Sequence, residues 1–450
     1  MPTRILIPSG VLGLGFDEAA LWRGVAAKPD LIAIDGGSTD SGPASLGTGT
    51  SKYARAAIKA EWRVLMKARA EAGVPLVIGT CGTAGADAHV DWMYQITKEL
   101  AQELGQSVKV ARLYSQQSPD RLKARFDAIT PLDPAPALSR EDLASMTAIV
   151  ALAGAEQVQA ALETGADIVL AGRTTDTAII AALPLARQEH PGAAWHGAKI
   201  GECGALCSSD PTSGVIQIDF DREGFTVTPL ADGAKCTPHS VCAHMLYENS
   251  DPFILYEPGG HLDVTNADYI AVDERSVRVT GAEWHPGTYT VKLEAARTAG
   301  YQTTLLATLR NRRYVENAQE WADKLLAFLD GKLAASLDLP RDSYTIDVRL
   351  IGVDSALGAL EARKGDPTEV GAFVIVTAPT QADATEIAKL INPFLLHYPL
   401  TRDEELPTFA FPYSPAHSER GALYEFAMNH ILTLDTPMDA FRIETEALRA

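Results

Sequence analysis

Short runs of hydrophobic residues alternate with longer amphipathic segments over residues 1–180. Two of the amphipathic segments, 51–73 and 87–105, carry apolar residues at helical spacing and end at a glycine, as helices often do. The hydrophobic runs are apolar at successive positions, which is typical of parallel strands that helices cover on both faces. The pattern predicts strands at 4–8, 30–35, 74–80, 108–114, 147–153 and 167–172.

The pattern changes near Gly214, where apolar and polar residues begin to alternate between turns rich in Gly and Asp. This alternation predicts antiparallel strands. Further elements follow toward the carboxyl terminus: we expect antiparallel strands within 214–230, 269–284 and 288–309, helices at 317–337 and 381–398, strands at 344–355 and 371–380, and an irregular segment at 407–415.

These elements predict an α/β protein with an N-terminal, mostly parallel sheet that has helices on both faces, followed by a mixed α+β C-terminal domain. The expected divisions are an α/β domain with ligand loops at 1–210, an antiparallel β-rich segment with a helix at 211–340, and a small α+β region at 341–450.

The chain carries a formal net charge of −19, from 58 acidic and 39 basic residues. Such a surface repels phosphate backbones and anionic lipids, so we expect neither nucleic acid nor membrane as a partner. No apolar run approaches the ~18 residues of a membrane span, and the amino terminus lacks a signal-peptide pattern. Five cysteines do not suit a secreted disulfide framework, so we expect a cytoplasmic location.

Small and hydroxyl-rich loops follow four of the expected parallel strands, at 8–17, 35–42, 79–87 and 172–178. The carboxyl ends of parallel strands meet at one sheet edge, and helix amino termini favour anions. We therefore expect a polar cleft with positive potential for a small anionic substrate. Its binding residues would be Ser38, Thr39, Gly82, Thr83, Arg173, Thr174, Thr175, Glu202 and Cys203. The alternative is that the hydroxyl and carboxylate groups are ordinary helix caps, worth ~1 kcal/mol each.

Arg173 is the expected anchor for a substrate carboxylate, because a guanidinium grips carboxylates with two parallel hydrogen bonds. The alternative is an ion pair with Asp176 or Asp40. Those two aspartates are the candidates for proton transfer, with Lys292 or His261 opposite them. Lys292 could instead extend to solvent from its strand, and His261 could lie in a solvated turn.

Cysteines and histidines gather in two segments, with Cys203 and Cys207 in the first and Cys236, His239, Cys242 and His244 in the second. Their spacing is irregular for a zinc site, so we assign no metal and no cofactor, and a metal-dependent hydro-lyase or hydrolase remains an alternative. The glycines at 10–15 match a dinucleotide motif only loosely, which leaves a nucleotide-dependent oxidoreductase as another alternative.

Several segments together resemble the acyclic terpene utilisation (AtuA-like) family, in particular "AIDGGSTDSGPASLGTG", "GTCGTAGADAHVDW", "ADIVLAGRTTDTA", "IGECGALCSS" and "TYTVKLEAARTAGYQTT". The resemblance extends to the segment "SPAHSERGALYEFAMNHIL" near the carboxyl terminus. It implies catabolism of branched acyclic compounds through carboxylates and CoA thioesters. It also implies a small partner protein, the size of a domain of about 100 residues.

From the loops and the resemblance together, we expect a lyase (hydratase or dehydratase) or an isomerase. It would act on a small branched carboxylate or its CoA thioester by removing a proton next to a carbonyl, and we expect it to form a homo-oligomer. The alternative outside catalysis is a ligand-binding or scaffold subunit of a two-protein complex.

Overall fold

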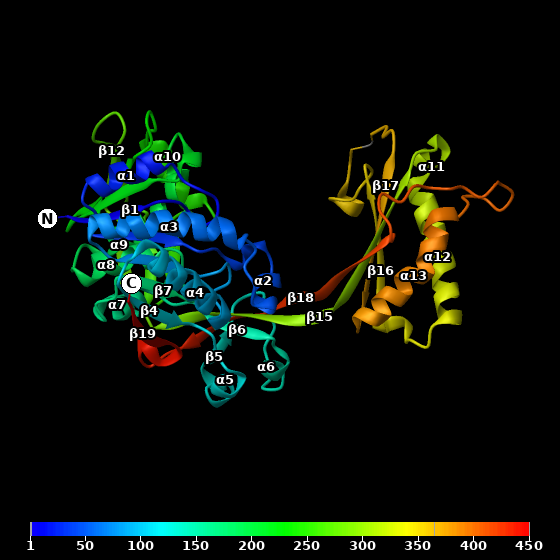
Figure 1. Cartoon of the computed structure of the whole chain (residues 1–450), viewed down its shortest axis with the longest axis horizontal. Helices are drawn as coiled ribbons and strands as arrows, with labels where there is room; N and C mark the ends of the chain where they lie inside the picture. The colour runs from blue at the N-terminus through cyan, green and yellow to red at the C-terminus, as the bar shows by residue number, and fades with distance from the viewer. Residues whose placement is uncertain (1, 364, 450) are drawn as a thin grey trace. The chain divides into compact units, whose positions relative to one another are not determined.

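A computed structural model describes residues 2–363 and 365–449 of the chain. The chain divides into two compact units, the first made of residues 1–297 and 426–450 and the second of residues 298–425. The chain passes from the first unit to the second within β15 (Thr290–Leu309) and returns within β18 (His417–Thr433) (Figure 1). The boundaries of these units differ from those expected after residues 210 and 340. The chain does not divide near residue 210, because the antiparallel strands that follow Gly214 extend the N-terminal sheet.

The described residues of the first unit form a ten-stranded sheet whose middle is parallel, as the sequence predicted. Its central strands lie in the order β1 (Thr3–Ile7), β2 (Leu31–Asp35), β3 (Leu76–Gly79), β7 (Ile168–Ala171) and β4 (Val108–Tyr114). Each neighbouring pair among them is parallel, in registers such as Ile5 opposite Leu31 and Val77 opposite Val169. The α/β fold class is therefore confirmed.

Antiparallel strands extend the sheet at both sides. β8 (Ile216–Phe220) pairs with β1, and the sheet continues through β9 (Gly224–Pro229), β13 (Val277–Thr280) and β12 (Asp268–Ala271). On the other side, the carboxyl-terminal strand β19 (Arg442–Leu448) pairs with β4.

One strand predicted for the parallel sheet lies elsewhere. β6 (Ala148–Ala151) pairs antiparallel with β15, with Leu293 opposite Ala151. Three of its four residues are buried in this position too, so the apolar run at 147–153 predicts a strand but does not specify its partner.

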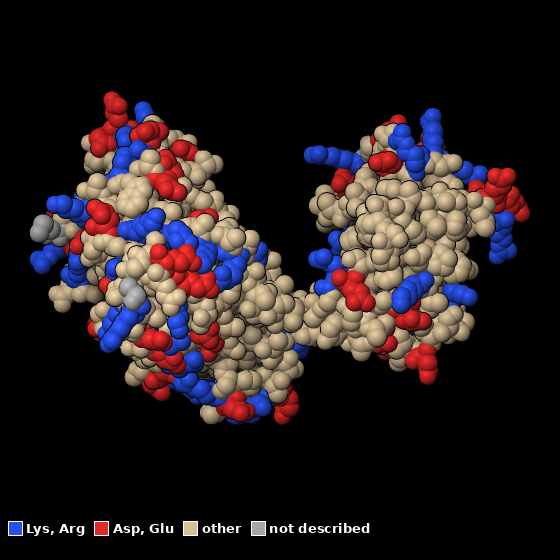
Figure 2. Space-filling model, in the orientation of Figure 1, with Lys and Arg blue, Asp and Glu red and all other residues tan. Residues whose placement is uncertain are grey.

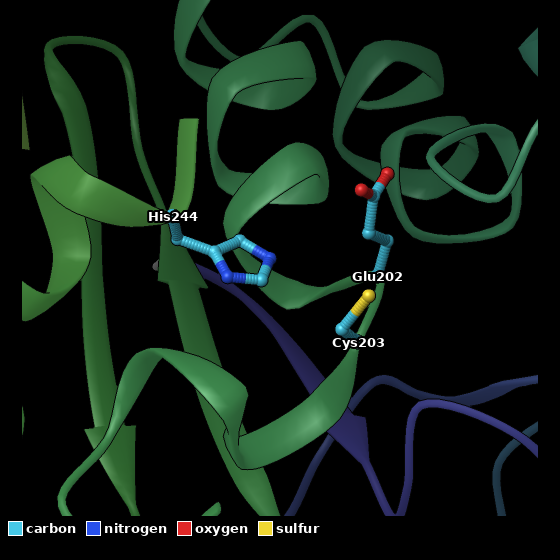
Figure 3. Close-up of side chains that lie close together, drawn as sticks. All are labelled: Glu202, Cys203 and His244. Carbon is cyan, nitrogen blue, oxygen red and sulfur yellow. The ribbon is translucent and has the colours of Figure 1, made fainter. Parts of the chain in front are cut away.

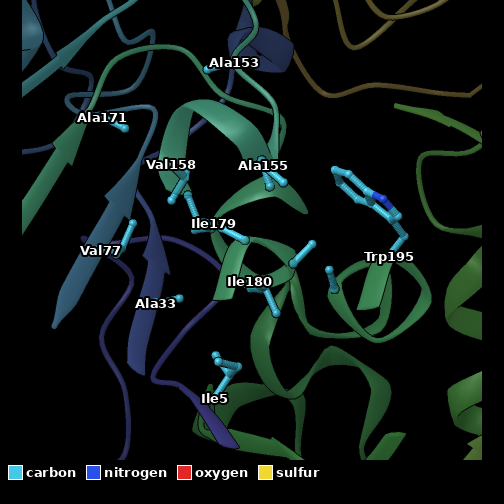
Figure 4. Close-up of a cluster of buried hydrophobic side chains, with 14 of the residues drawn as sticks. Ile5, Ala33, Val77, Ala153, Ala155, Val158, Ala171, Ile179, Ile180 and Trp195 are labelled. Atoms are coloured by element: carbon cyan, nitrogen blue, oxygen red, sulfur yellow. The ribbon is translucent and has the colours of Figure 1, made fainter. Parts of the chain in front are cut away.

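Helices cover both faces of the sheet, because alternate strand residues point to opposite sides. Ile5 and Ile7 lie in one hydrophobic cluster with residues of α7 (Ala155–Glu163), α8 (Ala178–Ala186) and α9 (Pro191–Gly201) (Figure 4). Leu6 lies in a second cluster with residues of α1 (Glu18–Ala26), α3 (Arg55–Ala72) and α4 (Asp87–Leu104). The predicted covering of both faces is confirmed.

The two long helices α3 and α4 end where the sequence predicted. Gly73 and Gly105 cap them in the left-handed conformation, with φ of 68° and 61°. Acidic and basic side chains are interspersed on the face of the first unit that Figure 2 shows. Some of these side chains form ion pairs between α3 and α4, where Lys59 contacts both Glu99 and Glu103.

Shorter elements complete the first unit. A three-stranded sheet has the order β10 (Ile254–Glu257), β11 (Gly260–Asp263) and β14 (Glu283–Pro286). The remaining elements are α2 (Ala44–Thr48), α5 (Pro119–Ala124), β5 (Ile129–Pro131), α6 (Asp142–Ser145), α10 (Pro238–Ala243) and the 3-10 helices η1 (Thr39–Ser41), η2 (Phe126–Ala128), η3 (Gly204–Cys207), η4 (Pro211–Ser213), η5 (His244–Leu246) and η8 (Pro437–Ala440).

The second unit packs helices against antiparallel strands around its own hydrophobic core. β17 (Val370–Ala378) pairs with both β15 and β16 (Thr345–Ile351) and buries every second residue. The core includes Trp321 and Leu325 of α12 (Ala318–Ser336) and Ile387 of α13 (Gln381–His397). Three short helices accompany them: α11 (Arg312–Glu316), η6 (Arg341–Ser343) and η7 (Gly358–Leu360). Among the described residues of both units, no helix is sufficiently long and apolar to cross a bilayer.

Candidate active site

The glycine-rich loops after the parallel strands converge at one edge of the sheet. Backbone hydrogen bonds join them: the Thr83 amide donates to the Gly36 carbonyl at 3.1 Å, and the Arg173 amide donates to the Gly85 carbonyl at 3.0 Å. A Cβ atom on Gly85 would lie 2.2 Å from the Arg173 nitrogen, so a larger residue would force these loops apart. The small residues are therefore required in part for contacts between loops.

A cavity of about 520 Å³ opens beside these loops in the first unit. Its walls come from the loops after β1, β2 and β7, from the residues after α9 and from residues around η5. The lining residues are Ser9, Gly10, Val11, Leu14, Gly15, Asp35, Gly37, Ser38, Asp40, Lys52, Tyr53, Asp176, Glu202, Cys203, Leu206, Pro211, Thr212, Gly214, Tyr247 and Glu248.

The cavity is acidic. Five carboxylic acids line it: Asp35, Asp40, Asp176, Glu202 and Glu248. Among the described residues, Lys52 is the only lysine or arginine in the lining. The expectation of a cleft with positive potential is therefore wrong, because the arginine on which it depended lies outside the lining and is already paired.

Burial and mutual repulsion disfavour ionisation of several of these acids. Burial, aided by the neighbouring Asp176 carboxylate, raises the pKa of Asp35 well above its usual range. Burial also raises the pKa of Asp176 to about 6, against the charge of Arg173 and with further repulsion from Asp40 and Glu248. Burial raises the pKa of Glu202 to about 8, although Lys199 opposes the shift. The cavity thus holds carboxyl groups that can exchange protons near neutral pH.

Arg173 is buried, and its guanidinium contacts two carboxylates. Its Nε lies 3.0 Å from Oε2 of Glu294 on β15, and its Nη1 lies 3.7 Å from Oδ1 of Asp176. Glu294 also accepts a hydrogen bond from the Thr39 hydroxyl at 2.9 Å and pairs with Lys292 at 3.1 Å. Burial raises the pKa of Glu294, but the charges of Arg173 and Lys292 outweigh burial and hold this pKa at about 2. Arg173 therefore positions Asp176 rather than presenting free donors to a ligand.

The structure brings some of the predicted site residues to this cavity. Ser38, Asp40, Asp176, Glu202 and Cys203 line it, and the Ser38 hydroxyl donates to Asp40 at 2.5 Å.

Other predicted residues support the loops from behind. Thr39, Thr83 and Thr174 are buried, and the Thr174 amide donates to the Thr80 hydroxyl at 3.3 Å. Gly82 is also buried, and a Cβ atom there would lie 2.8 Å from the Cβ of His89. Because the Thr83 amide donates to the Gly36 carbonyl, it is not free to bind a ligand.

Three predicted residues line a different cavity of about 620 Å³, also within the first unit. Thr175, His261 and Lys292 lie there beside apolar residues such as Leu152 and Ile431. The predicted arrangement of Lys292 or His261 opposite Asp176 in one cleft is thus not found. Asp263, two residues beyond His261, accepts a hydrogen bond from the Thr265 amide at 2.8 Å.

Sequence reasoning missed several residues of the acidic cavity. Asp35 ends a buried strand, which was a usable signal. Lys52, Tyr247 and Glu248 lie in segments without a recognisable motif, and only tertiary structure places them at the cavity. Lys199, on α9, forms a buried ion pair with Glu202 and also donates to the Tyr247 carbonyl at 2.8 Å.

The fold and the cavity define an α/β protein with an acidic cleft at the carboxyl edge of a parallel sheet. The model of a protein family described as acyclic terpene utilisation family protein AtuA matches residues 44–401. The chain belongs to this family, as the sequence resemblance predicted. Membership implies a role in acyclic terpene utilisation, a catabolic pathway.

The matched range contains Asp176, Glu202 and Cys203, whereas Asp35 and Asp40 precede it. Comparison with curated proteins gives no match, and comparison with solved structures gives none either.

Proposed function

We propose that the protein is a lyase or isomerase that transfers a proton at the carbon next to a carbonyl, with the acidic cavity as its active site. The observation that carries this proposal is the position of Asp176. It lies at the carboxyl end of a parallel strand, it lines the cavity, and Arg173 holds it from behind. A general base needs such a fixed position within reach of the substrate proton.

The other lining residues supply the remaining roles. Asp176 takes the proton from carbon, and the electron pair moves toward the carbonyl oxygen to form an enolate. The Lys52 ammonium group, which lines the same cavity, stabilises the charge that develops on this oxygen. In a dehydration, the Asp35 carboxyl group, whose pKa burial raises well above its usual range, protonates the hydroxyl that leaves the neighbouring carbon as water, and the electron pair forms the double bond. In an isomerisation, an acid of the same cavity returns the proton at a different carbon.

The charge of the cavity limits which classes of substrate can bind there. Among the described lining residues, Lys52 is the only basic side chain beside five carboxylic acids, so a free carboxylate would find one cation to pair with and would be repelled by each acid that is ionised. The acyl part of a thioester has no charge and avoids this repulsion. We therefore favour a branched acyl-CoA thioester over the free acid, with the CoA phosphates outside the cavity.

Proton exchange with solvent tests the proposal without knowledge of the product. The full chain is incubated in deuterium oxide with a set of branched acyl-CoA thioesters and with the matching free acids. Deuterium incorporated next to the carbonyl is then measured by mass spectrometry. We expect exchange with at least one thioester, and a loss of about 10²-fold or more in Asp176→Asn, as for removal of a general base.

A matched control is Asp232→Asn, because the Asp232 side chain belongs to the same unit but is 92% exposed. This variant should exchange at the wild-type rate. Exchange that is equally fast in Asp176→Asn would contradict the assigned base. Tight thioester binding with no exchange and no product would favour the non-catalytic ligand-binding subunit.

A further inference from the structure

Three side chains that can bind metal ions meet at the wall of the acidic cavity. The ligand atoms of Glu202, Cys203 and His244 all lie within 4.8 Å of one another. Glu202 and Cys203 follow α9, and His244 begins η5 (Figure 3). The imidazole ring of His244 points toward the other two side chains (Figure 3). Segments that are about 40 residues apart in the chain thus meet at one point, and only tertiary contacts bring them together.

The buried imidazole of His244 gives independent support for a bound ligand at this cluster. The residue is 5% exposed, and its Nε2 atom has no hydrogen-bond partner among the described residues. A buried polar atom left without a partner costs about 1–3 kcal/mol, so native structures rarely leave one unsatisfied. The ring stacks on Tyr247, with centroids 5.5 Å apart and planes inclined by 11°, and this contact holds its orientation. A ligand at the cluster would satisfy Nε2 without moving the ring.

The surrounding charges favour a cation as that ligand. Glu202 and Cys203 line the cavity that also contains the carboxyl groups of Asp35, Asp40 and Asp176. Lys199 forms an ion pair with Glu202 and donates a hydrogen bond to the Tyr247 carbonyl, which fixes the orientation of the Glu202 carboxylate. Residues that hydrogen-bond to metal ligands orient those ligands in the same way.

We propose that Glu202, Cys203 and His244 form a binding site for a divalent transition metal of the zinc type. A thiolate and an imidazole select Zn²⁺ or Co²⁺ over Mg²⁺ and Ca²⁺, which prefer oxygen ligands alone. Three protein ligands leave a coordination position open, as in catalytic zinc sites. Because Glu202 and Cys203 line the cavity, a metal bound to them would lie at its wall.

Binding at this site releases the thiol proton of Cys203. The S–H bond of Cys203 breaks, a sulfur–metal bond forms with the electron pair of the thiolate, and the proton leaves to solvent. This proposal does not depend on the proton-transfer activity proposed above, because its readout is the metal itself.

Cobalt spectroscopy on the full chain tests the site. Chelator-treated protein is titrated with Co²⁺, and absorption is followed in the near-ultraviolet and visible ranges. We expect one ion per chain, a thiolate-to-cobalt charge-transfer band, displacement by Zn²⁺, and no displacement by Mg²⁺. Cys203→Ser should lose the charge-transfer band, and His244→Gln should weaken binding at least tenfold, with circular dichroism confirming that both variants fold.

Other thiols provide controls and a competing assignment. Cys242→Ser should leave the titration unchanged, because Cys242 is exposed and lies outside the cluster. Cys207 and Cys236 are buried with their sulfur atoms 4.0 Å apart, so they form a second pair of soft atoms. A band that persists in Cys203→Ser but disappears in Cys236→Ala would overturn the proposal. So would the absence of stoichiometric binding in the wild-type chain.

Discussion

Replacing Arg173 by glutamine tests how much the buried ion pair beneath the cavity stabilises the fold. The guanidinium and the Glu294 carboxylate are each 7% exposed and lie 3.0 Å apart. The pKa of Glu294 is held at about 2 rather than the ordinary 4.5. A difference of this size corresponds to about 3 kcal/mol of stability at neutral pH. Removal of one partner from a buried pair typically costs about 3–5 kcal/mol, and we expect Arg173→Gln to fall in that range.

Lys292 provides a matched control, because it contacts the same carboxylate from a more exposed position. Its ammonium group lies 3.1 Å from Glu294, but its side chain is 42% exposed. Exposed pairs contribute at most about 1 kcal/mol, so Lys292→Gln should cost far less than Arg173→Gln. The double variant Arg173→Gln/Glu294→Gln should recover part of the loss, because it removes the deeply buried Glu294 carboxylate, while Asp176 still loses its contact with Arg173.

The assay is urea unfolding of the full chain followed by tryptophan fluorescence. Five of the six tryptophans lie in the first unit, so the signal reports mainly on the unit that holds the pair: Trp22, Trp62, Trp92, Trp195 and Trp284.

The pH dependence of the unfolding free energy tests the role of this ion pair more sharply than a urea midpoint at one pH. In the wild type, the depressed pKa of Glu294 contributes stability that is present above pH 4.5 and is lost as the pH falls through about 2. Without Arg173, burial should raise this pKa above 4.5, so the variant should lose stability as the pH rises from 4 to 7. The deficit of Arg173→Gln should therefore be larger at pH 7 than at pH 4. Equal costs for Arg173→Gln and Lys292→Gln, or a deficit independent of pH, would refute the reasoning.

Two further predictions concern buried groups near the cavities. Burial raises the pKa of Glu257 from 4.5 to about 7, so its contribution to stability is fully present below pH 4.5 and is lost as the pH rises through 7. Glu257→Gln keeps an oxygen that can accept from Thr177 and removes this loss. Its stability relative to wild type should improve by up to about 3 kcal/mol between pH 5 and pH 8 in urea unfolding, and an unchanged difference would contradict the assigned pKa. Gly85→Ala should cost more than about 3 kcal/mol, because its Cβ would lie 2.2 Å from the Arg173 nitrogen. Gly105 has nearly the same positive φ, but no atom of the described residues would lie within 4 Å of an added Cβ, so Gly105→Ala should cost only the backbone penalty of about 1–2 kcal/mol. Equal thermal shifts in the two variants would argue against crowding.

Local pattern was sufficient to predict most of the elements. The apolar run at 108–114 corresponds to β4, and the helical periodicity of 51–73 and 87–105 corresponds to α3 and α4. These predictions succeed because strand and helix periods depend on residues that are close in the chain. The positions of the ligand loops at one sheet edge also followed from local information, since parallel strands place their carboxyl ends together.

Tertiary structure alone decided strand partners and the charge of the cavity. Most of the run at 147–153 is buried against β15, as a strand of the parallel sheet would also be, so its own residues could not specify β15 as the partner. The sequence suggested that Arg173 could bind a substrate carboxylate. In the structure it forms an ion pair with Glu294, which is more than a hundred residues away in the chain. His244 meets Glu202 and Cys203 only because η5 and the end of α9 pack together. Sequence patterns determine local conformation over a few residues. Pairing, burial and pKa instead depend on contacts between distant segments, which the folded chain alone specifies.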